Sequence, residues 1–131
     1  MGLVIYIDSS VALARLLLEP RFPPERLWRE RLVSSQLLEY EVWNRVHAYN
    51  LADQIGGEVQ RLLMRVGMIE MTRSVLARAL EPLPIPLRTL DSLHLATMEF
   101  VRGQTQTLEL ASYDDRLLAA AKAVGIPVTP L

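Results

Sequence analysis

Short apolar segments alternate with longer amphipathic segments along the chain. Residues 3–7 form a continuous apolar run rich in β-branched side chains, which is typical of a strand covered on both faces. Expected strands lie at residues 3–7, 32–35, 68–72, 107–111 and 126–129. Expected helices lie at about 9–18, 23–31, 36–53, 58–66, 73–80, 88–102 and 114–124. This alternation predicts a three-layer α/β/α fold, with a parallel sheet between two layers of helices.

Glycines set several of the expected boundaries. Gly56 and Gly57 are expected to interrupt the helical pattern. Gly67 is expected to end the helix before the third strand, and Gly103 the helix before the fourth. The alternating prolines within residues 82–86 predict an extended connection, because each proline disfavours helical geometry in the residue before it.

The composition narrows the class of protein. The chain has 131 residues, half of them hydrophobic, and no repeat or linker, so we expect one domain over residues 1–131. The absence of cysteine excludes disulfides, thiolate metal sites and a thiol nucleophile. With no basic leader and no apolar run near the roughly 18 residues of a membrane-spanning helix, we expect a cytoplasmic protein. The net charge of −1 confines any nucleic-acid binding to local basic patches.

Acidic residues follow the ends of two predicted strands. Asp8 follows the first strand, and Asp114 and Asp115 follow the fourth. In a parallel sheet of about five strands in the order 3-2-1-4-5, these acids meet where the strand order reverses, which is where open sheets bind ligands. Glu41, near the start of the helix after the second strand, and Asp91, in the first turn of the helix before the fourth, have apolar neighbours and could join them.

Converging carboxylates repel one another unless they are protonated or bind cations. The cluster therefore predicts a divalent metal, with Mg²⁺ or Mn²⁺ as the expected ion. Such ions activate water and stabilise charge on phosphoryl oxygens, which is the chemistry of phosphodiester hydrolysis. Taken singly, Asp8 and Asp114 can instead cap helices. Glu41 can pair with Arg45, and Asp91 can favour the positive end of its helix.

Four blocks of sequence surround these acids. They are Val4-Ile-Tyr-Ile-Asp8-Ser-Ser, Ser35-Gln-Leu-Leu-Glu-Tyr-Glu41-Val-Trp-Asn44, Leu90-Asp91-Ser-Leu-His-Leu-Ala96 and Ala111-Ser-Tyr-Asp114-Asp-Arg-Leu117. In this order and at these intervals, the blocks resemble those of PIN-domain nucleases, and specifically of VapC-type toxins of bacterial toxin–antitoxin pairs. The similarity covers nearly the whole chain.

The resemblance implies a PIN-like fold and a metal-dependent endoribonuclease that cleaves RNA to a 5′-phosphate and a 3′-hydroxyl. It also implies a cognate VapB-like antitoxin as partner and often a homodimer. The residues implied to be catalytic and to hold one or two Mg²⁺ or Mn²⁺ ions are Asp8, Glu41, Asp91 and Asp114. Supporting roles are expected for Ser9, Ser112, Asn44 and Asp115. Glu39 and Asp115 are lesser rivals of Glu41 and Asp114 as ligands.

Basic residues and histidines offer further candidates. Arg45, Arg88 and Arg116 lie near candidate acids in sequence and are candidates for contacts with RNA phosphates, with local ion pairs as an equal alternative. His94 and His47 support an alternative function, metal-independent acid–base cleavage of RNA. A further alternative is a non-catalytic α/β interaction module whose acids only cap helices.

Overall fold

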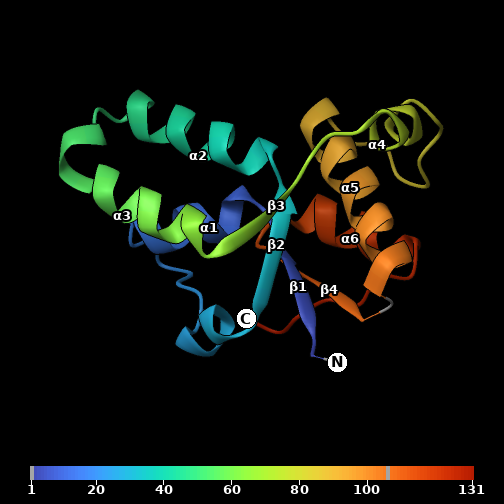
Figure 1. Cartoon of the computed structure of the whole chain (residues 1–131), viewed down its shortest axis with the longest axis horizontal. Helices are drawn as coiled ribbons and strands as arrows, with labels where there is room; N and C mark the ends of the chain where they lie inside the picture. The colour runs from blue at the N-terminus through green and yellow to red at the C-terminus, as the bar shows by residue number, and fades with distance from the viewer. Residues whose placement is uncertain (1, 106) are drawn as a thin grey trace.

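The computed structural model describes residues 2–105 and 107–131, which form a four-stranded parallel sheet between two layers of helices (Figure 1). The strands are β1 (Val4–Ile7), β2 (Arg31–Ser35), β3 (Val66–Ile69) and β4 (Leu108–Ala111), in the spatial order β3-β2-β1-β4. Each neighbouring pair of strands is parallel. The predicted α/β fold and the order of these strands are confirmed.

The helices divide between the two faces of the sheet. They are α1 (Ser9–Leu16), α2 (Leu37–Ala48), α3 (Ala52–Met64), α4 (Arg73–Ala79), α5 (Thr89–Thr105) and α6 (Asp115–Ala123), with a short 3₁₀-helix, η1 (Glu25–Arg29). In Figure 1, α1, α2 and α3 lie on one side of the sheet, and α4, α5 and α6 lie on the other. Among the described residues, no helix combines the length and the apolar character needed to cross a membrane.

The central strand β1 is buried on both faces, as its continuous apolar run predicts. Ile5 and Ile7 belong to a hydrophobic cluster with residues of α1, α2 and α3. Val4 and Tyr6 belong to a second cluster with residues of α5 and α6. Because side chains alternate along a strand, β1 contributes to both hydrophobic clusters. Asp8, which follows β1, therefore lies at the end of the strand between the two clusters.

The last expected strand, residues 126–129, is reduced to a single bridge between Leu110 and Val128. The Leu110 N–H donates to the Pro127 carbonyl and the Thr129 N–H donates to the Leu110 carbonyl, both at 2.8 Å. Pro127 has no N–H to donate to β4 one step earlier, so the ladder does not extend. The sheet therefore has four strands rather than about five, although the last segment lies beside β4 as the predicted order requires.

The chain breaks between α2 and α3 at Asn50 rather than at the glycines. Asn50 has a φ of 56°, a left-handed conformation that asparagine tolerates better than most residues. Gly56 and Gly57 lie inside α3, so the expected interruption there is wrong. A Cβ on Gly56 would lie 3.5 Å from the ring of Trp43 on α2, an ordinary van der Waals distance, so this glycine lies on the face of α3 that packs against α2.

Two other glycine boundaries also differ. Gly67 lies within β3, which begins at Val66, about two residues before the expected strand, because this segment pairs with β2. Gly103 lies within α5, which continues to Thr105. A Cβ on Gly103 would meet nothing within 4 Å, so this glycine marks open surface rather than the end of the helix.

Candidate functional site

A cavity of about 270 Å³ is lined by five acids, among them the four predicted ones, Asp8, Glu41, Asp91 and Asp114, and is called here the acidic cavity. Asp8 directly follows β1, and Asp114 lies three residues after the end of the neighbouring strand β4. Glu41 comes from α2, and Asp91 comes from the first turn of α5. The four predicted carboxylates therefore come from four separate segments of the chain and meet in one cavity at the edge where the parallel strands end.

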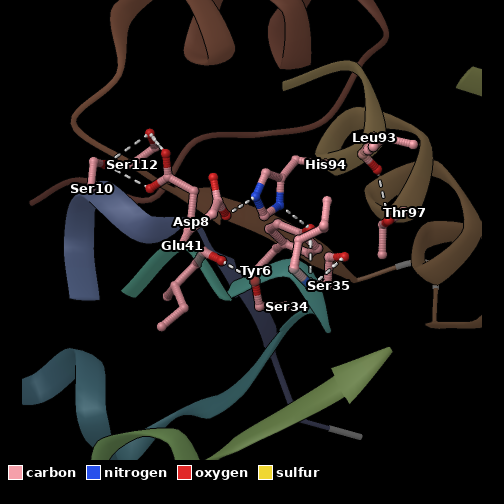
Figure 2. A network of polar contacts seen from close by, with 12 residues as sticks. Tyr6, Asp8, Ser10, Ser34, Ser35, Glu41, Leu93, His94, Thr97 and Ser112 are labelled. Carbon is pink, nitrogen blue, oxygen red and sulfur yellow. Dashed lines mark hydrogen bonds and ion pairs between the residues drawn. The ribbon is translucent and has the colours of Figure 1, made fainter. Parts of the chain in front are cut away.

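Asp8 is the buried acid of this cavity, with only 4% of its surface exposed. Ser10 Oγ donates to Asp8 Oδ1 at 2.6 Å, and Ser112 Oγ donates to Asp8 Oδ2 at 3.0 Å (Figure 2). Burial raises the pKa of Asp8 to about 6, although the two hydroxyl donors and the positive charge of His94 oppose the rise. Within the described residues, Asp8 has no Arg, Lys or His partner in an ion pair. Neutral donors therefore fix its orientation.

A chain of hydrogen bonds, called here the Tyr6–His94 relay, connects the backbone of β2 to Glu41 (Figure 2). The Ser35 N–H donates to Tyr6 Oη at 3.0 Å. Tyr6 Oη lies 2.6 Å from His94 Nδ1, and His94 Nε2 lies 2.6 Å from Glu41 Oε1. Because the backbone N–H can only donate, the Tyr6 hydroxyl accepts that bond and is free to give its own hydrogen to Nδ1.

The relay keeps a hydrogen on His94 Nε2 in both charge states of the ring. In the charged imidazole both nitrogens carry hydrogen, and in the neutral ring the Tyr6 donor selects the Nε2 tautomer. Burial lowers the pKa of His94, but the hydrogen bond to Glu41 and the charges of the cavity acids raise it more, so the net shift is upward. Burial also raises the pKa of Tyr6 above its usual value. His94 Nε2 therefore donates to Glu41 and orients that carboxylate.

Asp114 combines a cap with a place in the acidic cavity. Its Oδ1 accepts from the Arg116 N–H at 3.0 Å and from the Leu117 N–H at 3.2 Å, which caps α6. The pKa of Asp91 is raised, first by partial burial and then by the negative charge of Asp114. Asp114 therefore caps α6 and lines the acidic cavity at the same time. The raised pKa of Asp91 indicates that the cavity acids repel one another.

Comparison with known proteins decides the family. A family model described as "PIN domain" matches residues 5–123. The chain belongs to the PIN-domain family. This PIN domain is 34% identical over 127 residues to "Ribonuclease VapC46" of Mycobacterium tuberculosis (strain ATCC 25618 / H37Rv), a match that covers 95% of each chain. It is also 28% identical over 129 residues to "Ribonuclease VapC47" of Mycobacterium tuberculosis (strain CDC 1551 / Oshkosh), with 93% of each covered. The resemblance expected from the four sequence blocks is confirmed.

A solved structure shares the fold of this PIN domain. It is described as "Toxin-antitoxin complex from Klebsiella pneumoniae", and the match covers 97% of this chain and 98% of that chain. The TM-score is 0.65 and the sequence identity is 18%. At this level of identity the likeness concerns the fold.

The remaining sequence candidates lie in different places. Ser9 and Arg45 line the acidic cavity. The candidates that are exposed and not among its lining residues are Asn44, Arg88, Asp115 and Arg116. Of the two adjacent aspartates after β4, Asp114 is therefore the one that reaches the cavity.

The rival glutamate and the second histidine belong to a different part of α2. Glu39 lines a separate cavity with Trp43, on the side of α2 that packs near α3. The ring of His47 stacks on Trp43 with 5.5 Å between centroids. Glu41 and His94 line the acidic cavity, whereas Glu39 and His47 do not.

Two polar residues of the acidic cavity escaped the sequence patterns. Glu19 lines the cavity from the loop after α1, where no strand end or motif marks it. Ser10 lines the cavity as well, and its hydroxyl, rather than that of Ser9, donates to Asp8. Tyr6 could have been noticed, because it precedes Asp8 by two residues and so shares its side of β1.

The donors of the acidic cavity fit a hard divalent cation. They are carboxylate and hydroxyl oxygens, which suit Mg²⁺ and Mn²⁺. Within residues 2–105 and 107–131, no group of three or more His, Asp or Glu side chains is placed so that together they could hold a metal ion. Mg²⁺ usually binds through one or two carboxylates and keeps several waters, so it needs no such group. A cation would also relieve the repulsion between Asp91 and Asp114.

Proposed function

We propose that this PIN domain is a metal-dependent endoribonuclease and the toxin of a VapBC-type toxin–antitoxin pair. The observation that carries the proposal is the convergence of Asp8, Glu41, Asp91 and Asp114 on one cavity from four segments of the chain. The names of the two ribonuclease relatives support RNA as the substrate. The likeness of the fold to a chain from a toxin–antitoxin complex supports an antitoxin as the partner.

In the proposed mechanism the four carboxylates hold one or two Mg²⁺ or Mn²⁺ ions. When bound, the metal supplies activation of a water molecule and stabilisation of negative charge on the phosphate. Ser10 and Ser112 hold the carboxylate of Asp8 in place through their hydroxyls. The Tyr6–His94 relay does the same for Glu41. The polar residues around the acids therefore fix donor positions before a ligand arrives, which is what orienting groups around a metal site do.

Two observations, one on each histidine, disfavour the metal-independent alternative. Both of its ring nitrogens already have partners, Tyr6 at Nδ1 and Glu41 at Nε2. His47 lies outside the acidic cavity and stacks on Trp43. Acid–base cleavage by two histidines requires both rings within reach of one substrate.

Two adjacent aspartates provide the matched test of the proposed function. Purified wild-type protein, Asp114→Asn and Asp115→Asn are assayed for cleavage of single-stranded RNA in Mn²⁺ and in EDTA, and for the change in melting temperature that Mn²⁺ causes. We expect Mn²⁺-dependent cleavage and a rise in melting temperature for the wild type and Asp115→Asn, because the metal binds the folded cavity. Asp114→Asn should be strongly impaired in both. Full cleavage in EDTA contradicts the metal mechanism. If the wild type shows no cleavage and no metal binding, the result supports the interaction module instead.

The proposed toxin role has its own test in cells. Overexpression of the wild-type chain without a partner should arrest growth, and overexpression of Asp91→Asn should be tolerated if RNA cleavage causes the arrest. Immunoblots must show equal amounts of the two proteins. Equal toxicity of the two chains would separate the phenotype from the acidic cavity.

We also propose a homodimer, which the family resemblance implies. Light scattering of the purified protein at several concentrations measures the mass directly. A monomer at all concentrations would contradict the dimer and leave the proposed cleavage chemistry unaffected.

A further inference from the structure

A second cavity adjoins the acidic cavity. It has a volume of about 310 Å³ and is lined by Ser10, Glu19, Pro20, Arg21 and Tyr113. Ser10 and Glu19 line both cavities, so the two are neighbours along the same edge of the sheet. A chain-like ligand that leaves the acidic cavity on this side therefore passes Arg21 and Tyr113.

Arg21 and Tyr113 form a cation–aromatic pair in this second cavity. The guanidinium carbon of Arg21 lies 4.8 Å from the centroid of the Tyr113 ring. Arg21 Nη2 also donates to the Tyr113 carbonyl at 2.9 Å. Arg21 is exposed, and in the part of the chain that the structure describes it forms no ion pair with a carboxylate. Its positive charge is therefore available to a ligand.

The pair has a fixed position relative to the buried acid. The Tyr113 N–H donates to Ser10 Oγ at 2.9 Å, and the same hydroxyl donates to Asp8 Oδ1 at 2.6 Å. The Tyr113 side chain also packs partly against the hydrophobic cluster on the α1 side of the sheet. One serine thus connects the cation–aromatic pair to the acid at the centre of the acidic cavity.

We propose that Arg21 and Tyr113 form a subsite for a nucleotide next to the scissile phosphate of single-stranded RNA, an inference that rests on the proposed function. The acidic cavity is lined by five acids and one arginine, Arg45, so it repels a polyanion on balance and a further cation beside it favours an RNA strand. The guanidinium of Arg21 presents planar donors that match phosphate oxygens. Unpaired bases stack on aromatic rings and on guanidinium planes, and this pair offers both surfaces.

The test measures binding of a short, fluorescein-labelled single-stranded RNA by anisotropy in EDTA at several salt concentrations. Arg21→Ala should weaken binding about tenfold and make the salt dependence shallower by about one phosphate contact. Tyr113→Leu should weaken binding about tenfold, which is the scale of one lost base stack, and Tyr113→Phe should restore it. The matched controls, Arg29→Ala and Tyr49→Leu, remove an exposed arginine and an exposed tyrosine that line neither cavity and should change binding less than twofold.

The possible results separate this subsite from the proposed function. If the wild type binds RNA and both Arg21→Ala and Tyr113→Leu bind equally well, the subsite is wrong, even if the wild type cleaves RNA in Mn²⁺. If the wild type neither binds nor cleaves RNA, the proposed function fails and the subsite fails with it. Melting curves accompany each variant, because Tyr113 contacts the core. Should Tyr113→Leu fail to fold, the exposed Arg21→Ala decides the result alone.

Discussion

The acidic cavity contrasts with a larger cavity lined by arginines. The larger one, called here the arginine cavity, has a volume of about 480 Å³, and its walls include Arg15, Arg61 and Arg65. Arg15 Nη1 lies 2.9 Å from the carboxylate of Glu25, and its guanidinium lies 4.9 Å from the ring centroid of Trp28. Arg65 donates to the Trp28 carbonyl. Two of these arginines are therefore already occupied by partners within the chain.

The acidic cavity is smaller, and its charge is compensated less. Asp8 is buried with hydroxyl donors alone, and its pKa is raised to about 6. A shift of about two pH units corresponds to roughly 3 kcal/mol of unfavourable free energy when the group is charged. An exposed pair such as Arg15–Glu25 contributes about 0–1 kcal/mol. The difference teaches that uncompensated buried charge, rather than cavity volume, distinguishes the acidic cavity, where we propose that the metal binds.

Asp8→Asn should have the largest effect, because it removes the buried charge that distinguishes the acidic cavity from the arginine cavity. Removal of its charge should lower RNA cleavage by at least about 100-fold, because even residues that only support a metal site often account for factors of about 10 to 100. The same variant should unfold at higher denaturant concentration than the wild type in EDTA at pH 7, and its melting temperature should no longer rise with Mn²⁺. Unchanged cleavage by a folded Asp8→Asn would remove Asp8 from the mechanism.

The next effect concerns the Tyr6–His94 relay. His94→Leu should weaken Mn²⁺ binding and cleavage by about 10- to 100-fold, because Glu41 loses the donor that orients it. His94→Gln keeps an N–H donor and should recover part of the loss. The leucine variant should also be less stable by about 1–3 kcal/mol for each buried polar group left without a partner. Calorimetric titration with Mn²⁺ at a temperature where both variants are folded checks this, and equal affinities would leave His94 a purely structural role.

A pH series sharpens the contrast without changing the metal chemistry. The folded pKa of Asp8, about 6, lies above its ordinary value of 3.8, so the folded state binds more protons between these values. Stability in EDTA should therefore fall by roughly 3 kcal/mol as pH rises from about 4 to 7, relative to Asp8→Asn. Urea unfolding of the two proteins across this range gives the difference. His94, whose folded pKa is raised, stabilises the folded state fully below pH 6.5. This stabilisation is lost as pH rises through the folded pKa of His94, at higher pH than the effect of Asp8. If the difference in stability between the wild type and Asp8→Asn stays constant from pH 4 to 7, titration of Asp8 is not its cause.

The smallest effects are expected in the arginine cavity. Arg15→Ala should lower the free energy of unfolding by about 1 kcal/mol, since it removes an exposed ion pair and a cation–aromatic contact. Arg61→Ala should change it even less. Both variants should cleave RNA within about twofold of the wild type, because surface substitutions away from a site have small effects. Strong loss of cleavage in either variant would mean that the functional surface is the larger arginine cavity and not the cavity with the uncompensated buried charge.

Much of the fold could be predicted because each signal is local. The apolar run at residues 3–7 specifies a strand covered on both faces, and β1 occupies the centre of the sheet. The positions of Asp8 and Asp114 after neighbouring strands then bring them to one edge. The glycine boundaries failed because the cost of a glycine inside a helix is small enough for the packing of the helix to outweigh it. Gly56 lies inside α3, and the turn is made at Asn50.

The details of the site depend on contacts between distant residues, and sequence periodicity carries no record of them. His94 meets Tyr6 across 88 residues and Glu41 across 53 residues. Ser112 reaches Asp8 across 104 residues. Glu19 enters the acidic cavity from a loop whose path depends on how α1 ends. Motif positions thus predict which acids converge, whereas the folded chain determines which neutral groups hold them.

The central strand has a consequence for protein synthesis. β1 pairs with β2, which follows closely in the chain, and with β4, which begins at residue 108. Ser112 and Asp114, which complete the surroundings of Asp8, come after β4. A nascent chain emerges from its N-terminus, so Asp8 leaves the ribosome 104 residues before Ser112. A chain that has not yet been synthesised past β4 therefore has no assembled acidic cavity.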